Sequence, residues 1–174
     1  KWLVLLISSY VFYILSSFRL TIFIVLTSFA VYLATRRITS IDIELKSRKK
    51  EVDREQFKEL KKIYNKRKKR TLLIALVLNF GVLAFFKYAD FFSGNINSLL
   101  GLSGSSSKIP MLNLIMPLGI SYYTLMAVSY VLDVYYGKYE ADKNIGRVFL
   151  FLSFFPHITE GPLDRYDTLA YQLY

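Results

Sequence analysis

Long apolar runs separated by one strongly basic stretch dominate the hydrophobic pattern of this chain. Residues 2–35 are apolar or weakly polar except for Arg19 near their middle. A single helix of that length would measure about 50 Å, well beyond a bilayer core of roughly 30 Å. We therefore predict a helical hairpin over 2–35 that turns at Ser16–Arg19, with two limbs that are each short for a full crossing.

The next stretch, 36–70, combines a helical pattern with dense positive charge. It holds fifteen Lys and Arg against six Asp and Glu, and so carries nearly all of the net charge of +10. A narrow apolar stripe that includes Phe57, Leu60 and Tyr64 predicts a basic amphipathic helix on the cytoplasmic membrane surface. We expect residues 46–70 to contact anionic lipid headgroups. The positive-inside rule explains this charge without nucleic acid, so no nucleic-acid partner is predicted.

Three further segments follow from the same pattern. Residues 71–92 predict a transmembrane helix that ends in charges and aromatic rings, as expected at an interface. Residues 93–110 carry one charge and predict an external loop. Residues 111–136 predict a second crossing, broken near Pro117 and Gly119, and the backbone groups freed there must face protein or a watery cavity.

The last apolar run, within 148–166, is too short to cross a bilayer before it reaches Glu160, Gly161 and Pro162. We predict a re-entrant segment in which the Gly-Pro pair turns the backbone. Glu160, Asp164 and Arg165 would then line a cavity or its cytoplasmic mouth; alternatively, Asp164 and Arg165 pair with each other or with helix ends at the interface. A lone histidine in a bent segment, His157, is more typical of a hydrogen-bonding or packing group than of a base.

The amino-acid composition excludes several kinds of functional site. The chain is 53% hydrophobic with a mean hydropathy of +0.33, which favours a membrane protein. It has no cysteine and one histidine, which excludes disulfides, thiolate zinc sites, cysteine nucleophiles and a His-rich metal cluster within these residues. Neither a Walker A loop nor a dinucleotide-binding glycine motif is present. We therefore expect no metal and no tightly bound cofactor.

Four stretches carry a family resemblance: the short helical start that precedes the basic segment, "FKYADFF" at 86–92, "MPLGISYYTLMAVSYVLDVYYGK" at 116–138 and "FLSFFPHITEGPLDRY" at 150–165. With them the sequence resembles the membrane-bound O-acyltransferase family, in particular its alginate O-acetyltransferase-like branch. The "GPLDRY" ending is also similar to the relative that transfers D-alanine to teichoic acids. The resemblance implies an all-α, polytopic, multi-pass protein of the bacterial cytoplasmic membrane.

The resemblance also implies an activity. Such enzymes move an acyl group, usually acetyl, from acetyl-CoA or a carrier-protein thioester to a hydroxyl of an envelope polysaccharide, often with a secreted or anchored acetyltransferase partner. Their catalytic histidine lies on a later helix, within a funnel that crosses the membrane. We expect the 174 residues to be the front part of such an enzyme and to be inactive alone, so no catalytic residue is assigned among them.

Polar or kinked positions in the matching motifs are the candidates for the wall of that funnel: Tyr122, Tyr123, Asp133, His157, Glu160, Asp164 and Arg165, with backbone breaks at Pro117, Gly119, Gly161 and Pro162. A different class of function stays open. The chain would then be a non-catalytic membrane scaffold, or a transporter-like component, that recruits a partner through its basic helix.

Overall fold

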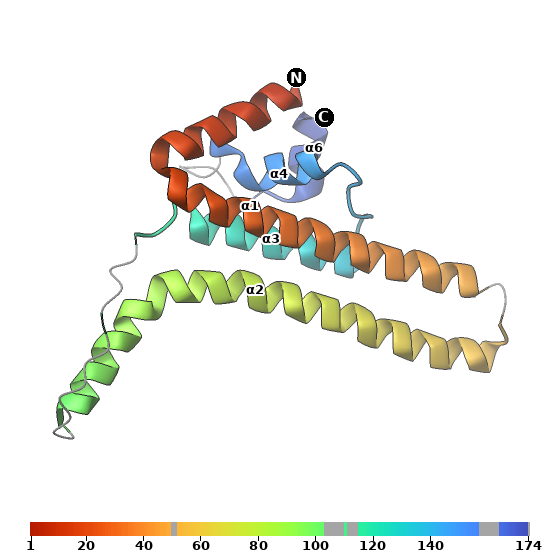
Figure 1. Ribbon diagram of the computed structural model, residues 1–174. Coiled ribbons are helices and arrows are strands. Elements are labelled where there is room, and N and C mark those ends of the chain that lie inside the picture. The colour runs from red at the N-terminus through yellow and green to blue at the C-terminus, as the bar shows by residue number, and fades with distance from the viewer. Residues whose placement is uncertain (50–51, 103–109, 111–114, 157–163, 174) are drawn as a thin grey trace.

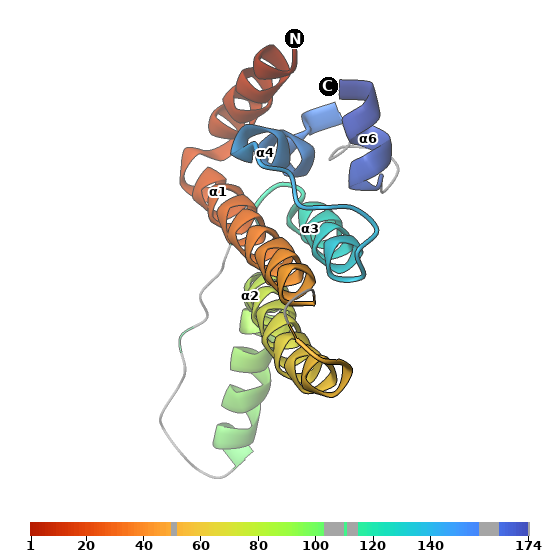
Figure 2. The ribbon, with the colours of Figure 1, turned by 90° about the vertical axis from the view of Figure 1, so that its right-hand side faces the viewer.

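Helices make up all the regular structure in the residues that the computed structural model describes, which are 1–49, 52–102, 110, 115–156 and 164–173. No strand occurs in these ranges, which confirms the all-α class. The elements are α1 (Trp2–Arg48), α2 (Arg54–Leu102), α3 (Ile120–Tyr135), α4 (Ile145–Ser153) and α6 (Tyr166–Leu173). As Figures 1 and 2 show, the long part of α1 lies at the centre and packs against α2, α3 and α4.

α1 bends sharply at Ser17, where φ is −165° and ψ is 103°. The Ser17 carbonyl accepts a hydrogen bond of 2.9 Å from the Thr21 hydroxyl, which begins the next helical turn. Two limbs result, and Figure 1 shows them as a V. The bend lies inside the Ser16–Arg19 segment in which the sequence predicts a turn.

The basic stretch 36–70 does not form the single separate helix that we predicted. Its first part is the end of α1, which continues to Arg48, and its second part is the start of α2 at Arg54. No glycine or proline interrupts the chain around positions 35 or 70, so both helices continue where the surroundings become polar. The change in charge therefore does not mark a helix end.

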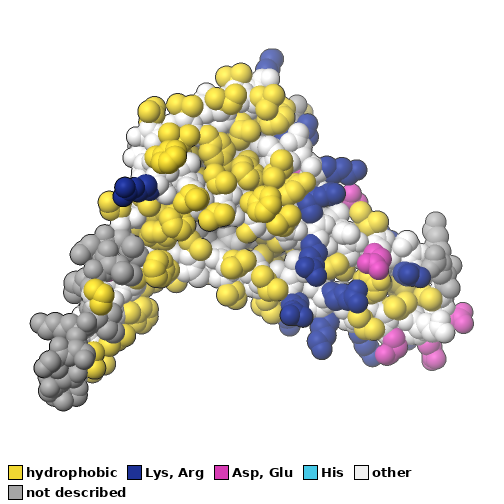
Figure 3. Space-filling view, viewed as in Figure 1, with side chains coloured by type: hydrophobic (Ala, Val, Ile, Leu, Met, Phe, Trp, Pro, Cys, Tyr) yellow, Lys and Arg dark blue, Asp and Glu magenta, His cyan; other side chains and the backbone are white. Residues whose placement is uncertain are grey.

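Side-chain contacts hold these two basic helix ends together. The Tyr64 hydroxyl donates to Glu44 at 2.7 Å, and the Lys68 ammonium pairs with Asp42 at 2.5 Å. The contact with the Glu44 carboxylate raises the pKa of Tyr64. We call this antiparallel pair of helix ends the basic arm; Figure 3 shows its charges gathered at one end of a largely apolar molecule.

The predicted external loop at 93–110 is also wrong in its first half, because α2 continues to Leu102. The only breakers between 93 and 102 are two glycines, and each costs a helix only about 1 kcal/mol. Pro110 is the one residue between 103 and 114 that lies in the described ranges, and it is not helical.

The break that we predicted inside 111–136 is instead the start of a helix. Residues 115–119 are not helical, and α3 begins at Ile120 directly after Gly119. Gly119 has a φ of +68°, a left-handed conformation that glycine adopts without strain. The Ile120 N–H donates to the Pro117 carbonyl at 3.2 Å, which closes this turn.

Basic residues recur at the same spacing in the two long helices. Arg19 and Arg36 are seventeen residues apart in α1, as are Arg70 and Lys87 in α2. Each interval corresponds to about 26 Å of helix, close to the thickness of a bilayer core of roughly 30 Å. The antiparallel register matches, since Phe23 and Phe86 meet edge to face at 4.7 Å between ring centres.

Both intervals present apolar side chains outward. Leu26 is 56% exposed and Val77 is 69% exposed, and many other large apolar residues of α1 and α2 are exposed. A soluble domain rarely shows so much apolar surface, whereas lipid would cover it. α1 and α2 are thus both long and apolar enough to cross a membrane.

A close contact between α1 and α4 provides a test of this packing. A Cβ at Gly146 would lie 2.9 Å from the indole of Trp2, the one tryptophan of the chain. We expect Gly146→Val to displace the indole and to shift its fluorescence emission. Gly81→Ala is the matched control, because its Cβ would meet nothing within 4 Å. Identical spectra for wild type and Gly146→Val would contradict the contact.

Candidate functional site

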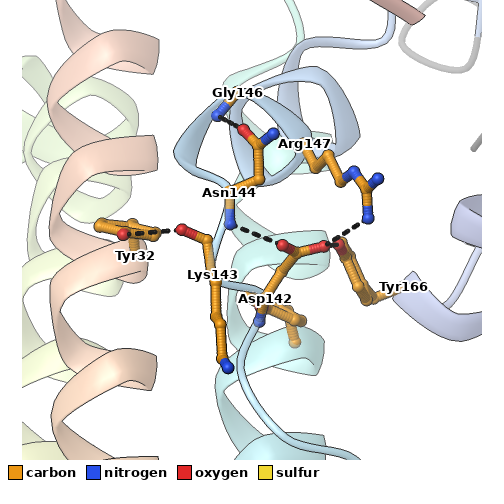
Figure 4. A network of polar contacts seen from close by, with 8 residues as sticks. Tyr32, Asp142, Lys143, Asn144, Gly146, Arg147 and Tyr166 are labelled. Atoms are coloured by element: carbon orange, nitrogen blue, oxygen red, sulfur yellow. Dashed lines mark hydrogen bonds and ion pairs between the residues drawn. The ribbon is translucent and has the colours of Figure 1, made fainter.

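Polar contacts centre on Asp142, in the turn between α3 and α4. Its carboxylate accepts the Asn144 N–H at 2.7 Å and the Tyr166 hydroxyl at 2.5 Å, and lies 3.8 Å from the Arg147 guanidinium (Figure 4). Asn144 in turn caps α4, because its side-chain oxygen accepts the Gly146 N–H at 2.9 Å. One carboxylate thus connects the start of α4 to the start of α6.

The same turn is attached to α1 and α3. The Tyr32 hydroxyl donates to the Lys143 carbonyl at 3.1 Å, and the Thr39 hydroxyl accepts the Ala141 N–H at 3.0 Å. The Asp142 N–H donates to the Tyr130 hydroxyl at 3.0 Å. We call this set of contacts the Asp142 cluster. It joins four helices and has the character of a structural anchor.

Asp133, a predicted cavity residue, lies beside this cluster. It accepts a hydrogen bond of 3.1 Å from the Tyr139 hydroxyl, and Lys138 lies 3.8 Å from Asp133 and 2.7 Å from Asp167. Burial, reinforced by the Asp133 charge, raises the pKa of Tyr139, and the hydrogen bond from Lys138 lowers the pKa of Asp167. The Asp133 carboxylate therefore has a lysine and a tyrosine as partners in this structure.

A second polar group involves both limbs of the bent helix α1. It consists of hydroxyls that are buried and have no hydrogen-bond partner within the described residues, which we call the buried hydroxyl cluster: Ser9, Tyr10, Tyr13, Ser28, Tyr123 and Ser153. They come from both limbs of α1, from α3 and from α4. The Tyr10 hydroxyl lies near Ser28 and Ser153 without the geometry of a hydrogen bond.

A small pocket adjoins this cluster. Tyr13 and Tyr123 line it together with Ser17 and Pro117, and its volume is about 10 Å³. That volume holds roughly one water molecule. The pocket therefore lies where the bend of α1 meets the turn that begins α3, two irregular backbone segments side by side.

Unpaired buried hydroxyls are costly, at roughly 1–3 kcal/mol each on mutational evidence, and lipid offers no water to pair with them. Water or a polar ligand would remove this cost. Serine and tyrosine hydroxyls are neutral near pH 7, so they donate and accept hydrogen bonds but do not serve as a general base. The cluster can orient a polar group; it does not by itself activate one.

The structure separates the predicted site residues into two places. Tyr123 is in the buried hydroxyl cluster and Pro117 lines the adjoining pocket, while Asp133 lies ten residues along α3, about 15 Å away. Half-buried Asp164 lies near Tyr122, and Arg165 is exposed. The remaining candidates fall outside the described residues: His157, Glu160, Gly161 and Pro162.

Several residues of both groups were not predicted from the sequence. Serines of the first apolar run read as ordinary membrane-helix residues, because a hydroxyl there can bond to its own helix backbone. In the sequence, Asp142 is one of the acids of a polar turn, and its anchoring contacts were not predicted. The serine pairs at 8–9 and 16–17 were the available signal of a polar site in the sequence. The other residues of that site come from α3 and α4, far along the chain.

Comparisons with known proteins identify relatives of this helical protein. It is 35% identical over 103 residues to a probable alginate O-acetylase of Pseudomonas syringae pv. tomato, covering 59% of this chain and 20% of that protein. It is 30% identical over 132 residues to the peptidoglycan O-acetyltransferase of Helicobacter pylori, covering 62% and 24%. The teichoic acid D-alanyltransferase of Bacillus subtilis is 40% identical over 65 residues, covering 37% and 16%.

These similarities confirm the resemblance that the motifs carry, because the matched relatives are named as O-acetylating and D-alanylating enzymes. It spans about a fifth of the length of the alginate O-acetylases that it matches. No family model matches the chain. No solved structure matches it either.

The Asp142 cluster yields a stability prediction. Asp142→Ala removes the acceptor for the exposed Asn144 N–H and for the part-buried Tyr166 hydroxyl, and each lost hydrogen bond costs about 0.5–1.5 kcal/mol. We expect a lower midpoint of thermal unfolding in detergent, and a smaller decrease for Tyr166→Phe. Glu140→Ala, an exposed acid of the same turn, should leave the midpoint unchanged. Equal midpoints for Asp142→Ala and Glu140→Ala would refute the anchoring role.

Proposed function

We propose that this chain forms part of a membrane O-acyltransferase that moves an acetyl or other acyl group from a thioester to hydroxyls of a cell-envelope polysaccharide. The similarity to three kinds of acyl-transferring enzyme supports this proposal. Two helices that are apolar and long enough to cross a membrane fit the same role. The relatives named above give no support to a scaffold or a transporter component.

In this reaction the acceptor oxygen attacks the thioester carbonyl carbon, a base takes the hydroxyl proton, and the thiolate leaves. We assign the base to a histidine outside these residues, as the family resemblance implies. The contribution of this chain would be part of the cavity wall. Acetyl-CoA or a carrier-protein thioester is the proposed donor, and a secreted or anchored acetyltransferase is a proposed partner.

The buried hydroxyl cluster is the part of this chain that suits such a wall best. Tyr13 and Tyr123 present unpaired hydroxyls beside the pocket at the two backbone irregularities. Neutral donors that are already oriented can hold a water or a substrate oxygen, because they need little reorganisation when the oxygen arrives. We therefore assign Tyr123 a positioning role, with the turn at Pro117 and Gly119 bringing it to the pocket.

The contacts of the last segment support a re-entrant path. Arg147 near its start and Tyr166 near its end both reach Asp142, so the chain leaves and returns on the same side of the molecule. α4 has nine residues, about 13 Å, which is less than half of a bilayer core. On this proposal residues 148–166 dip into the bilayer from the cytoplasmic side, and 46–70 lie against anionic headgroups there.

Transfer itself is the direct test of the proposed function. Membranes that contain the complete natural protein should move labelled acetyl from acetyl-CoA onto envelope polysaccharide, measured as base-released label. Membranes without the protein provide the background. Equal labelling of the two, with carrier-bound acetyl thioester as well as acetyl-CoA, would reject the acetyltransferase function.

A tyrosine substitution tests the buried hydroxyl cluster within the complete enzyme. Tyr123→Phe removes one hydroxyl, and the loss of one hydrogen bond should lower transfer by roughly two- to tenfold. Removal of an unpaired buried hydroxyl should leave the unfolding midpoint equal or higher. Tyr136→Phe is the control, because Tyr136 is 78% exposed. Unchanged transfer in Tyr123→Phe would remove this residue from the site.

A further inference from the structure

A long groove runs between α1 and α2, on the side of α1 that does not face α3 and α4. Its volume is about 1070 Å³, at the upper end of the range for small-molecule sites of roughly 300–1,000 Å³. α1 contributes positions spaced three or four residues apart, which lie on one helix face. The principal lining residues are Leu26, Leu33, Arg37, Arg70, Ile74 and Leu78.

The groove changes character along its length. At one end it is apolar, with Leu26 and Leu78 both more than half exposed. At the other end it is cationic, because Arg37, Arg67 and Arg70 gather there with one acid, Glu44. A carboxylate oxygen of Glu44 already accepts the Tyr64 hydroxyl, so the acid is engaged on the basic arm.

Two of these arginines lack an acidic partner. Within the part of the chain that the structure describes, no carboxylate forms an ion pair with Arg37 or Arg70. Arg67 lies over the Tyr64 ring at 5.7 Å. The groove therefore ends in positive charge that the described chain does not neutralise, which suits a bound anion.

The length of the groove matches one leaflet. From Leu26 to Arg37 the helix rises by about 16 Å, and half of a bilayer core is about 15 Å. Leu26 lies near the midpoint of the Arg19–Arg36 interval. Arg37 directly follows Arg36, at the end of the interval that continues into the basic arm. An acyl chain would lie along the leucines while its headgroup met the arginines.

We propose that this groove binds one anionic phospholipid from the leaflet that faces the basic arm. Its phosphate contacts Arg37 and Arg70, and one acyl chain lies between Leu26, Leu33 and Ile74. Charge complementarity and the match to leaflet depth select a phospholipid over a neutral lipid or an apolar helix. This site lies outside the buried hydroxyl cluster and does not depend on the acyltransferase proposal.

Lipid retention by the full-length protein in detergent tests the proposal. Native mass spectrometry after addition of phosphatidylglycerol or phosphatidylcholine counts bound lipid. We expect one phosphatidylglycerol to be retained in clear preference to phosphatidylcholine, and inorganic phosphate to compete weakly because it lacks the acyl chain. Arg37→Gln combined with Arg70→Gln should reduce retention by roughly fivefold for each charge removed.

Two control variants separate the groove from general surface charge. Lys66→Gln combined with Lys69→Gln removes two exposed charges from the same turns of α2 outside the groove, and should preserve retention. Ala30→Trp fills the apolar part without altering charge and should abolish retention, whereas Ile22→Trp, on exposed surface outside the groove, should not.

Three results would overturn the proposal. Equal retention of the two lipids would show that the net negative charge of the headgroup does not select the lipid. Equal losses in the arginine and lysine pairs would indicate diffuse attraction to the basic arm. Full retention in Ala30→Trp would show that the acyl chain does not lie in the groove, as when another protein segment fills it.

Discussion

The antiparallel pairing of α1 and α2 is the constraint on which the other elements depend. Both helices continue unbroken from an apolar interval of about 26 Å into a charged one, and the basic residues that bound the two intervals lie within about one helical turn of each other. The contacts from Tyr64 to Glu44 and from Lys68 to Asp42 fix this register outside the apolar part. Within lipid a helix satisfies its own backbone groups, so the pair can extend through both media without a change of structure.

α3 and α4 pack against α1, α3 also packs against α2, and α6 packs against α4. The Asp142 cluster places the turn after α3 at the level of Tyr32 and Thr39, close to where α1 becomes charged. Around it Tyr130 packs against Tyr139, Phe151 and Tyr166, with ring centres 4.5–6.0 Å apart. Polar contacts are thus concentrated at the end of the apolar interval where α1 becomes charged. The bend of α1 and the start of α3 form the interior at the opposite end of that interval.

That interior contains most of the buried polar side chains that have no hydrogen-bond partner within the described residues. Six buried hydroxyls from four helical segments have no partner among the described residues, and two of them, Tyr13 and Tyr123, line a pocket for about one water. A stable soluble core would pair such groups, at a gain of about 1 kcal/mol for each bond. Their convergence is the structural reason for placing the positioning role of this chain at Tyr13 and Tyr123 rather than at Asp133, whose partners are a tyrosine and a lysine.

The sequence by itself determined the helical class, the apolar intervals, the basic segment and the family resemblance, because these depend on local composition and short motifs. It also indicated the irregular backbone at Ser16–Arg19 and at Pro117–Gly119, where flexible or helix-breaking residues act locally. Tertiary structure alone decided that the basic stretch is two helix ends, that Tyr123 meets Tyr13, and that Asp142 joins α4 to α6. Those outcomes depend on contacts between residues that are distant in sequence, and neither charge nor hydrophobic period encodes which distant partner a side chain meets.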